Sequence, residues 1–306
     1  MTDGKPLTKW VLTGGSWVSV MQAFRIGSIA SVLGITLGSV MAFSQSSPDN
    51  VEETVCGWFK ERAAFLSWSM AAGRPNPDAW KAVSGAEPVS HKTRDGRMLR
   101  GFKISTPPAS NTSTETRGFL LFAQGNAMLA DHSLDTLKDF ATHGINVFVY
   151  DYRGYGNSEG KRRLKAIVSD YREIFDALKK AYSGRKYLYG VSFEGIVLLN
   201  LIGRSADFDK AVIDSTPSRV STFGCPEEYD PVLNLPANGA NLFLISGKKD
   251  TVVTPADQAE LMSKGQSRGA RVMVAEEFAH AFADPDDSVH LKRQKLVRDF
   301  LFQTGP

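Results

Sequence analysis

The sequence predicts an α/β fold with a mostly parallel sheet that helices cover on both faces. The first observation is a set of six short apolar runs, each typical of a buried strand: 118–124, 145–152, 186–192, 210–215, 241–247 and 271–277. The second is that helix-like amphipathic segments alternate with these runs: 133–144, 167–182, 194–205, 255–266 and 288–303. Near-continuous apolar strands that alternate with such helices form parallel sheets buried on both faces.

Two further segments precede the first of these strands. Residues 89–105 contain two strand-like runs around Asp95-Gly96, a dipeptide that favours a hairpin turn. Residues 50–85 are moderately polar and helix-like, and they end in a proline-rich stretch. We therefore expect a helical extension over residues 46–86 and one α/β domain over residues 87–306.

Composition argues against several classes of protein. The 306 residues are 42% hydrophobic and 23% charged, which is ordinary for a folded globular chain, and the net charge is only +3. No block of lysine and arginine with interleaved aromatics is present, so we expect no nucleic-acid partner. Cys56 and Cys225 are the only cysteines, and their spacing suits no metal site. We favour two unpaired thiols over the single disulfide that export would permit.

The first 45 residues have the layout of a targeting segment. Residues 26–43 carry no charge, basic residues precede them, and a small, polar stretch follows. This order is typical of a signal peptide, and translation from Met21 would give it a compact basic region. Eighteen such residues are also close to the lower limit for a membrane-spanning helix. We expect an exported protein, periplasmic or secreted, or one anchored in the membrane by residues 26–43; the third alternative is an irregular segment of a cytosolic protein.

Polar side chains that suit nucleophilic catalysis follow the apolar runs. Ser192 ends the third run, Asp250 follows the fifth and His280 follows the sixth. In an open parallel sheet these strand ends form the ligand site. A serine hydroxyl needs a base to take its proton, and the base needs a carboxylate to orient it. The chain order serine, aspartate, histidine therefore favours Ser192 as a nucleophile, with Asp214, after the fourth run, as the rival acid.

The residues around the serine almost match G-x-S-x-G, the turn that exposes a nucleophilic serine between a strand and a helix. In Gly190-Val191-Ser192-Phe193-Glu194-Gly195, Glu194 replaces the last glycine and Gly195 comes one place late. We expect Glu194 to be tolerated, because negative charge is favourable in the first turn of a helix. The alternative is a carboxylate that faces the site, where it binds a cationic substrate or alters the pKa of the histidine.

Four motifs in this order resemble those of the α/β-hydrolases, in the serine-hydrolase branch that includes lysophospholipase-like and aminopeptidase-like proteins. Residues 148–160 (FVYDYRGYGNSEG) resemble the D-x-R-G-x-G-x-S turn after the fourth strand. Residues 121–127 (LFAQGNA) resemble the oxyanion loop, with Gln124 in place of histidine. Residues 246–255 (SGKKDTVVTP) resemble the acid loop, and residues 278–284 (FAHAFAD) resemble the histidine turn.

The resemblance, which covers about residues 87 to 303, implies an α/β-hydrolase fold and a catalytic triad. Ser192 would be the nucleophile, His280 the general base and Asp250 its orienting acid. The backbone N–H groups of Asn126 and Phe193 would form the oxyanion hole. Such a site needs no cofactor and no metal.

The interval 216–240 is too short for a helical cap. We therefore expect no large cap domain and a rather open site, partly covered by Phe223, Tyr229 and the helix at 50–70. The predicted function is a serine hydrolase that cleaves carboxylic esters or thioesters, small-molecule or lipid-like, through an acyl-enzyme. The same triad would serve a peptidase or amidase, and the fold also occurs in catalytically weak binding proteins.

Overall fold

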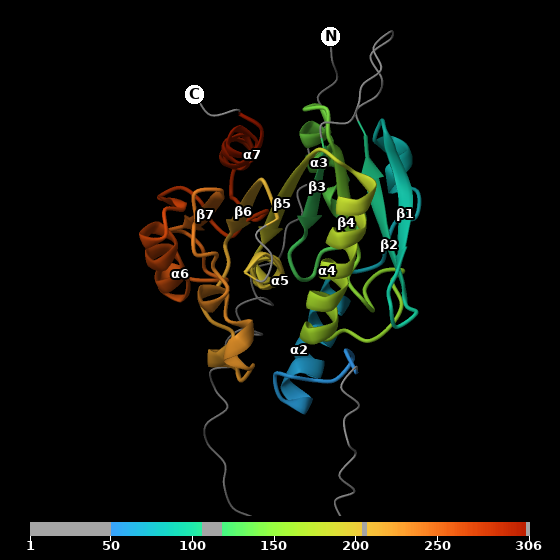
Figure 1. Cartoon of the computed structure of the whole chain (residues 1–306), viewed down its shortest axis with the longest axis horizontal. Helices are drawn as coiled ribbons and strands as arrows, with labels where there is room; N and C mark the ends of the chain where they lie inside the picture. Colours follow the sequence, from blue (N-terminus) through green and yellow to red (C-terminus); the bar gives the residue numbers. More distant parts are fainter. Residues whose placement is uncertain (1–49, 106–117, 204–206, 304–306) are drawn as a thin grey trace, which may run out of the picture. The chain divides into compact units, whose positions relative to one another are not determined.

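The computed structural model describes residues 50–105, 118–203 and 207–303. They form one eight-stranded sheet in the order β1-β2-β4-β3-β5-β6-β7-β8 (Figure 1). β1, β2 and β4 pair antiparallel, and the remaining neighbours are parallel, so the predicted mostly parallel sheet is confirmed. The strands are β1 (Ala86–Lys92), β2 (Met98–Ile104), β3 (Gly118–Ala123), β4 (Asn146–Tyr150), β5 (Arg185–Val191), β6 (Lys210–Asp214), β7 (Leu242–Gly247) and β8 (Arg271–Ala275).

Helices cover both faces of the sheet, because successive side chains of a strand point to opposite faces. Along β3, Leu121 packs in a core that includes residues of α4, α5 and α6, whereas Leu120 packs in a second core with residues of α3 and α7. This two-sided burial explains why the strands are apolar at nearly every position. The helices are α2 (Trp58–Ala71), α3 (Leu134–Ala141), α4 (Leu164–Ala181), α5 (Phe193–Ile202), α6 (Pro255–Ser267) and α7 (Asp287–Phe302).

The predicted hairpin is present as β1 and β2, which pair from Ala86 opposite Ile104 to Lys92 opposite Met98. Gly96 occupies the turn with a φ of 87°, a left-handed value that glycine adopts without strain. Before the hairpin, the helix-like segment at 50–85 contains α2 and one 3₁₀ turn, Ala79–Ala82. Helix is therefore confined to the middle and the end of that segment.

The connection between β6 and β7 has no cap domain, as predicted. Within residues 216–240 the structure contains only three short 3₁₀ turns, Ser221–Phe223, Glu227–Tyr229 and Pro231–Leu233. No inserted helical cap within residues 216–240 therefore covers the end of the sheet next to this connection.

Cys56 and Cys225 form a disulfide across a sequence separation of 169 residues, so the expectation of two unpaired thiols was wrong. The bridge joins the segment just before α2 to the connection between β6 and β7. Spacing along the chain carries no information about such a contact, because only the packing of α2 on the domain brings the two sulfur atoms together.

The targeting segment predicted at residues 1–45 lies outside the described residues. Within the residues that are described, the helices are too short or too polar to cross a bilayer.

A buried arginine organises the turn after β4. The Arg153 side chain is fully buried and forms ion pairs with Glu52 (3.2 Å), Asp95 and Asp170. The turn with the D-x-R-G pattern is thereby tied to the segment before α2, to the hairpin and to α4. These contacts support a structural role for Arg153.

Candidate active site

Ser192 lies in a strained turn between the end of β5 and the start of α5. Its backbone has φ 61° and ψ −120°, a conformation that a non-glycine residue rarely adopts. Three hydrogen bonds hold it: its N–H donates to the Asp214 carbonyl oxygen (2.8 Å), and its own carbonyl oxygen accepts from the Thr216 hydroxyl (2.9 Å) and the Gly195 N–H (3.1 Å). Such a strand-to-helix turn is the backbone that presents a nucleophilic serine.

The glycine that this turn requires is Gly195, one place later than the usual pattern. A Cβ atom at Gly195 would lie 1.8 Å from Thr216 Oγ1, so no larger residue fits beside the end of β6. Gly190 makes the second close approach, since a Cβ there would lie 2.9 Å from the Glu194 carbonyl oxygen. The close packing of α5 therefore survives the replacement of glycine by Glu194.

Glu194 differs from both of its predicted roles. Its side chain is fully buried, and within the described residues neither carboxyl oxygen has a hydrogen-bond partner at bonding distance. Burial raises the pKa of the carboxyl well above its usual range, and the Tyr152 hydroxyl beside it offsets only part of that effect. Burial therefore favours the protonated form of this carboxyl, and the side chain does not face an open site.

Asp250 and His280 are brought together by the loops after β7 and β8. His280 Nδ1 lies 2.9 Å from Asp250 Oδ2, and the Asp250 side chain is fully buried. The other carboxylate oxygen accepts the backbone N–H groups of Val252 and Val253, both at 2.9 Å. These bonds fix the carboxylate, which in turn orients the imidazole ring.

The end of β6 connects this pair to Ser192. The Ser192 N–H bonds to Asp214, and the hydroxyl of the next residue, Ser215, accepts the N–H of Ala281 at 3.1 Å. The histidine loop and the serine turn therefore flank the same strand end. In the part of the chain that is described, no direct hydrogen bond joins Ser192 Oγ to the His280 ring.

Asp214, the rival acid, has a different partner. Its carboxylate is fully buried, with Oδ2 at 3.6 Å from Nε of the buried Arg293. Asp250, not Asp214, is the carboxylate within hydrogen-bond distance of His280.

The loop after β3 lies against the serine turn. A Cβ atom at Gly125 would be 4.0 Å from Ser192 Cβ. Asn126 follows directly, and its side-chain oxygen accepts a hydrogen bond from the Tyr155 hydroxyl at 3.3 Å. Among the described residues, the backbone N–H groups of Asn126 and Phe193 have no protein acceptor. The assignment of these two N–H groups to an oxyanion hole stays a prediction.

Helix α2 packs directly on this part of the site. The Phe193 ring meets Phe65 and Trp68 at centroid separations of 5.3 and 6.0 Å. The Tyr155 hydroxyl lies 3.5 Å from the Phe65 carbonyl oxygen as well as close to Asn126. Tyr155 belongs to the turn after β4, and its place after an apolar strand end is the sequence signal that it lies near the site.

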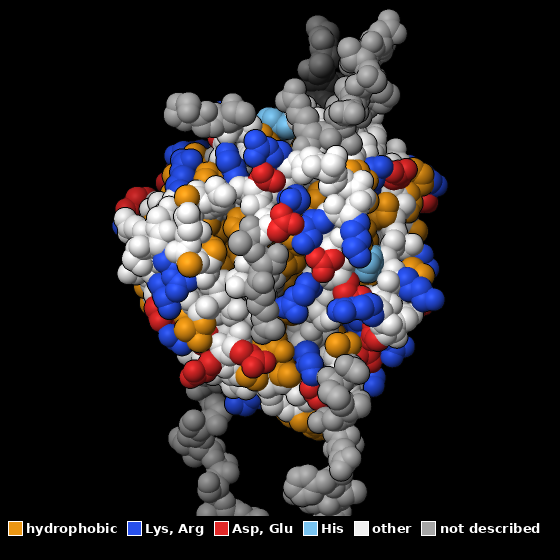
Figure 2. All heavy atoms as spheres, viewed as in Figure 1, with side chains coloured by type: hydrophobic (Ala, Val, Ile, Leu, Met, Phe, Trp, Pro, Cys, Tyr) orange, Lys and Arg blue, Asp and Glu red, His pale blue; other side chains and the backbone are white. Residues whose placement is uncertain are grey.

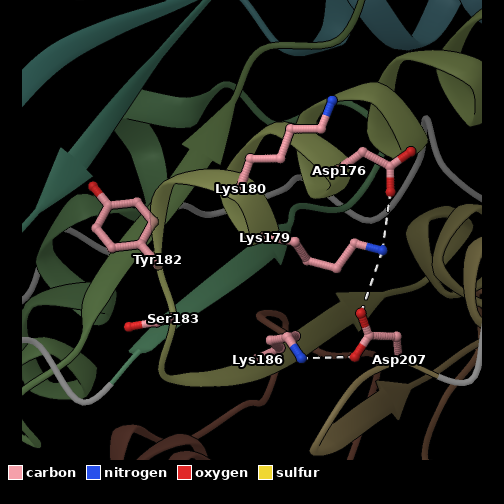
Figure 3. A pocket seen from close by; sticks show the side chains of 7 residues that line it. All are labelled: Asp176, Lys179, Lys180, Tyr182, Ser183, Lys186 and Asp207. Atoms are coloured by element: carbon pink, nitrogen blue, oxygen red, sulfur yellow. Dashed lines mark hydrogen bonds and ion pairs between the residues drawn. The ribbon is translucent and has the colours of Figure 1, made fainter.

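A surface hollow of about 450 Å³ lies at the opposite end of the sheet, between the end of α4 and the start of β5 (Figure 3). Two of its lysines are paired with one carboxylate: Lys186 Nζ lies 2.6 Å and Lys179 Nζ 3.5 Å from the Asp207 carboxylate. The hollow precedes β5, whereas Ser192 follows it, so the two are separated by the length of the strand. The hollow contributes nothing to the serine site.

Comparison with known proteins agrees with the fold. A family model described as "Serine aminopeptidase, S33" matches residues 114–223, which include the loop after β3 and Ser192. The esterase Pf2001 of Pyrococcus furiosus has a similar structure, with a TM-score of 0.59 and 17% sequence identity over 75% of this chain and 96% of that one. The chain therefore has the fold of solved α/β-hydrolases, and over residues 114–223 it is similar to the serine aminopeptidase family.

Two proteins illustrate the sequence similarity between this chain and its relatives. The uncharacterized protein YfhR of Escherichia coli K12 is 27% identical over 251 residues, which are 75% of this chain and 84% of that protein. The lysophosphatidylserine lipase ABHD12 of Danio rerio is 31% identical over 91 residues, 29% of this chain and 24% of that protein. Hydrolase relatives and esterase neighbours together support a hydrolase.

Proposed function

We propose that the protein is a serine hydrolase that cleaves carboxylic esters or thioesters through an acyl-enzyme. The observation that carries the proposal is the strained Ser192 turn, which shares the end of β6 with the loop of a hydrogen-bonded His280–Asp250 pair. Serine, base and orienting acid are the minimum set for nucleophilic catalysis by a hydroxyl.

In the proposed reaction, Ser192 Oγ attacks the carbonyl carbon of the ester while His280 takes the hydroxyl proton. The N–H groups of Asn126 and Phe193 stabilise the oxyanion of the tetrahedral intermediate. His280 gives its proton to the departing alcohol, which leaves the acyl group on Ser192. His280 then deprotonates a water molecule, whose attack releases the acid and restores the serine.

The choice of esters over amides rests on the open strand ends and on the relatives. No cap roofs the site between β6 and β7, and similar proteins include an esterase and a lysophosphatidylserine lipase. The matching family model is named for a serine aminopeptidase, so hydrolysis of amides is the second candidate function. Comparing p-nitrophenyl esters with aminoacyl amides separates the two, and faster amide turnover would favour the peptidase.

Labelling with a fluorophosphonate probe tests the nucleophile. We expect the wild type to label and Ser192→Ala to label at least about 10³-fold more slowly, because the attacking oxygen is gone. Ser267→Ala is the control, since Ser267 is exposed at the end of α6 and its hydroxyl donates to the Lys264 carbonyl oxygen of the same helix. Absence of labelling in the wild type would leave a catalytically weak binding protein, and equal labelling of Ser192→Ala would exclude Ser192.

We infer that the protein is exported, with residues 1–45 as its targeting segment, ahead of the extension at 46–86 and the hydrolase domain at 87–306. The disulfide between Cys56 and Cys225 supports export, because such bonds persist in oxidising compartments. N-terminal sequencing of the protein from the cell envelope and the medium is expected to begin after residue 40 if a signal peptide is cleaved. An intact start in the membrane fraction would favour the anchor, and an intact start in the cytosol would contradict export.

A further inference from the structure

Helix α2 is apolar on two opposite faces. One face packs on the site through Phe65 and Trp68. The other carries Phe59, Ala63, Leu66 and Met70, whose spacings of four, three and four residues align them along one side of a helix. All four are exposed, with Phe59 and Met70 each at 73% and Leu66 at 49%. We call these four residues the outer stripe.

The exposed charges on α2 are cationic. Lys60 and Arg62 are exposed, whereas Glu61 is buried and accepts the backbone N–H groups of Val55 and Cys56. Trp58, 64% exposed, begins the helix, with the Arg62 guanidinium 4.3 Å from its ring centre. Figure 2 shows hydrophobic side chains at the lower edge of the molecule, where Figure 1 places α2, with both basic and acidic side chains near them.

This combination matches the chemistry of a membrane interface. An apolar helix face inserts among acyl chains, exposed Trp and Phe side chains suit the headgroup level, and neighbouring cations attract anionic lipids. The sequence adds an independent observation, because the uncharged residues 26–43 precede α2 by a short connection, residues 44–57. The disulfide at Cys56 holds the end of that connection on the domain.

We propose that the outer stripe docks on the surface of an anionic lipid bilayer, and that the substrate is an ester of a lipid drawn from that bilayer. This inference rests on the proposed function and names its substrate class. Phe65 and Trp68 lie on the inner side of α2, between the stripe and Phe193. A docked bilayer would therefore lie about one helix diameter, roughly 10 Å, from the serine turn. An acyl ester could reach Ser192 along the apolar side chains of α2.

The first test compares two substrates in the full chain. One is a fluorogenic ester lipid in vesicles of phosphatidylcholine and phosphatidylglycerol, and the other is soluble p-nitrophenyl butyrate. The triple variant Phe59→Ser, Leu66→Ser, Met70→Ser is expected to lose roughly tenfold or more of its rate on the vesicle substrate, because three apolar contacts with lipid are removed. Its rate on the soluble ester is expected to stay within about twofold. Leu291→Ser is the matched control, since Leu291 is 52% exposed on α7.

Three outcomes of this experiment would count against the docking surface. An unchanged vesicle rate in the triple variant would overturn the docking surface, and an equal loss on both substrates would assign the stripe to folding. A shift from dimer to monomer in analytical ultracentrifugation of the triple variant would mean that a second copy covers the stripe, which also overturns the proposal.

A second measurement does not depend on catalysis. Brominated acyl chains quench a tryptophan that enters the membrane, so wild-type protein bound to brominated phosphatidylglycerol vesicles is expected to lose more fluorescence than Trp58→Phe. Equal quenching of both proteins would overturn the docking surface. If quenching at Trp58 is found but neither ester is cleaved, the proposed function fails while the docking surface stands.

Discussion

Asp250→Asn is expected to lower kcat for ester hydrolysis by about 10³- to 10⁴-fold, with little change in the free energy of unfolding. The physical reason is the proton on His280. Asp250 Oδ2 accepts the Nδ1–H of the ring across 2.9 Å, which leaves Nε2 free to take the serine proton. An asparagine amide donates toward Nδ1, so the proton moves to Nε2 and the ring no longer serves as a base. Steady-state kinetics on p-nitrophenyl butyrate measures the loss.

Asp214→Asn is the matched control for this prediction. Asp214 is also fully buried at a strand end, but its carboxylate pairs with Arg293. We expect the Asp214 variant to keep kcat within about tenfold and to lose stability instead, because a buried cation loses part of its pairing. A larger loss of kcat in Asp214→Asn than in Asp250→Asn would transfer the orienting role to Asp214.

Glu194→Gln is expected to make the protein more stable at alkaline pH than the wild type. Burial raises the pKa of Glu194 in the folded state, so the folded protein keeps a proton that the unfolded chain loses above about pH 4.5. The wild-type free energy of unfolding therefore falls as pH rises from that value toward the folded-state pKa. Glutamine does not titrate, so its advantage grows by up to about 1.4 kcal/mol per pH unit.

Urea unfolding of both proteins at pH 3, 6, 7.5 and 9 measures this difference. Near pH 3 the pH-dependent part of the difference is expected to vanish, since Glu194 is then protonated in both the folded and the unfolded state. Glu61→Gln is the matched control: Glu61 is as buried, at 2% exposure, but it accepts three backbone N–H bonds, so its loss is expected to destabilise the fold. An advantage of Glu194→Gln that does not grow with pH would contradict a neutral Glu194.

The residues that follow the strands show which parts of the candidate site the sequence pattern was sufficient to predict. Ser192, Asp250 and His280 were predicted from their positions after apolar runs, and the structure brings the latter two to hydrogen-bond distance. That inference works because parallel strands all deliver their carboxyl ends to one edge of a sheet. The roles of the three residues in catalysis stay predictions.

The surroundings of Glu194 could not be predicted from the sequence pattern. From the sequence it belongs to the first turn of a helix, where charge is favourable. Its raised pKa follows from burial by the packed fold, which the Tyr152 hydroxyl only partly offsets. Protonation depends on this three-dimensional surrounding, which helical position alone does not reveal.

Local periodicity and turn chemistry were sufficient to predict the alternation of strands and helices, the hairpin at Asp95-Gly96 and the absence of a cap. These properties depend on residues that lie close together in the chain, so the sequence pattern is sufficient to predict them. The disulfide between Cys56 and Cys225, the burial of Glu194 and the packing of α2 on Phe193 depend on contacts between residues far apart in the chain. Such contacts exist only after the chain has packed, and only the tertiary structure could decide them.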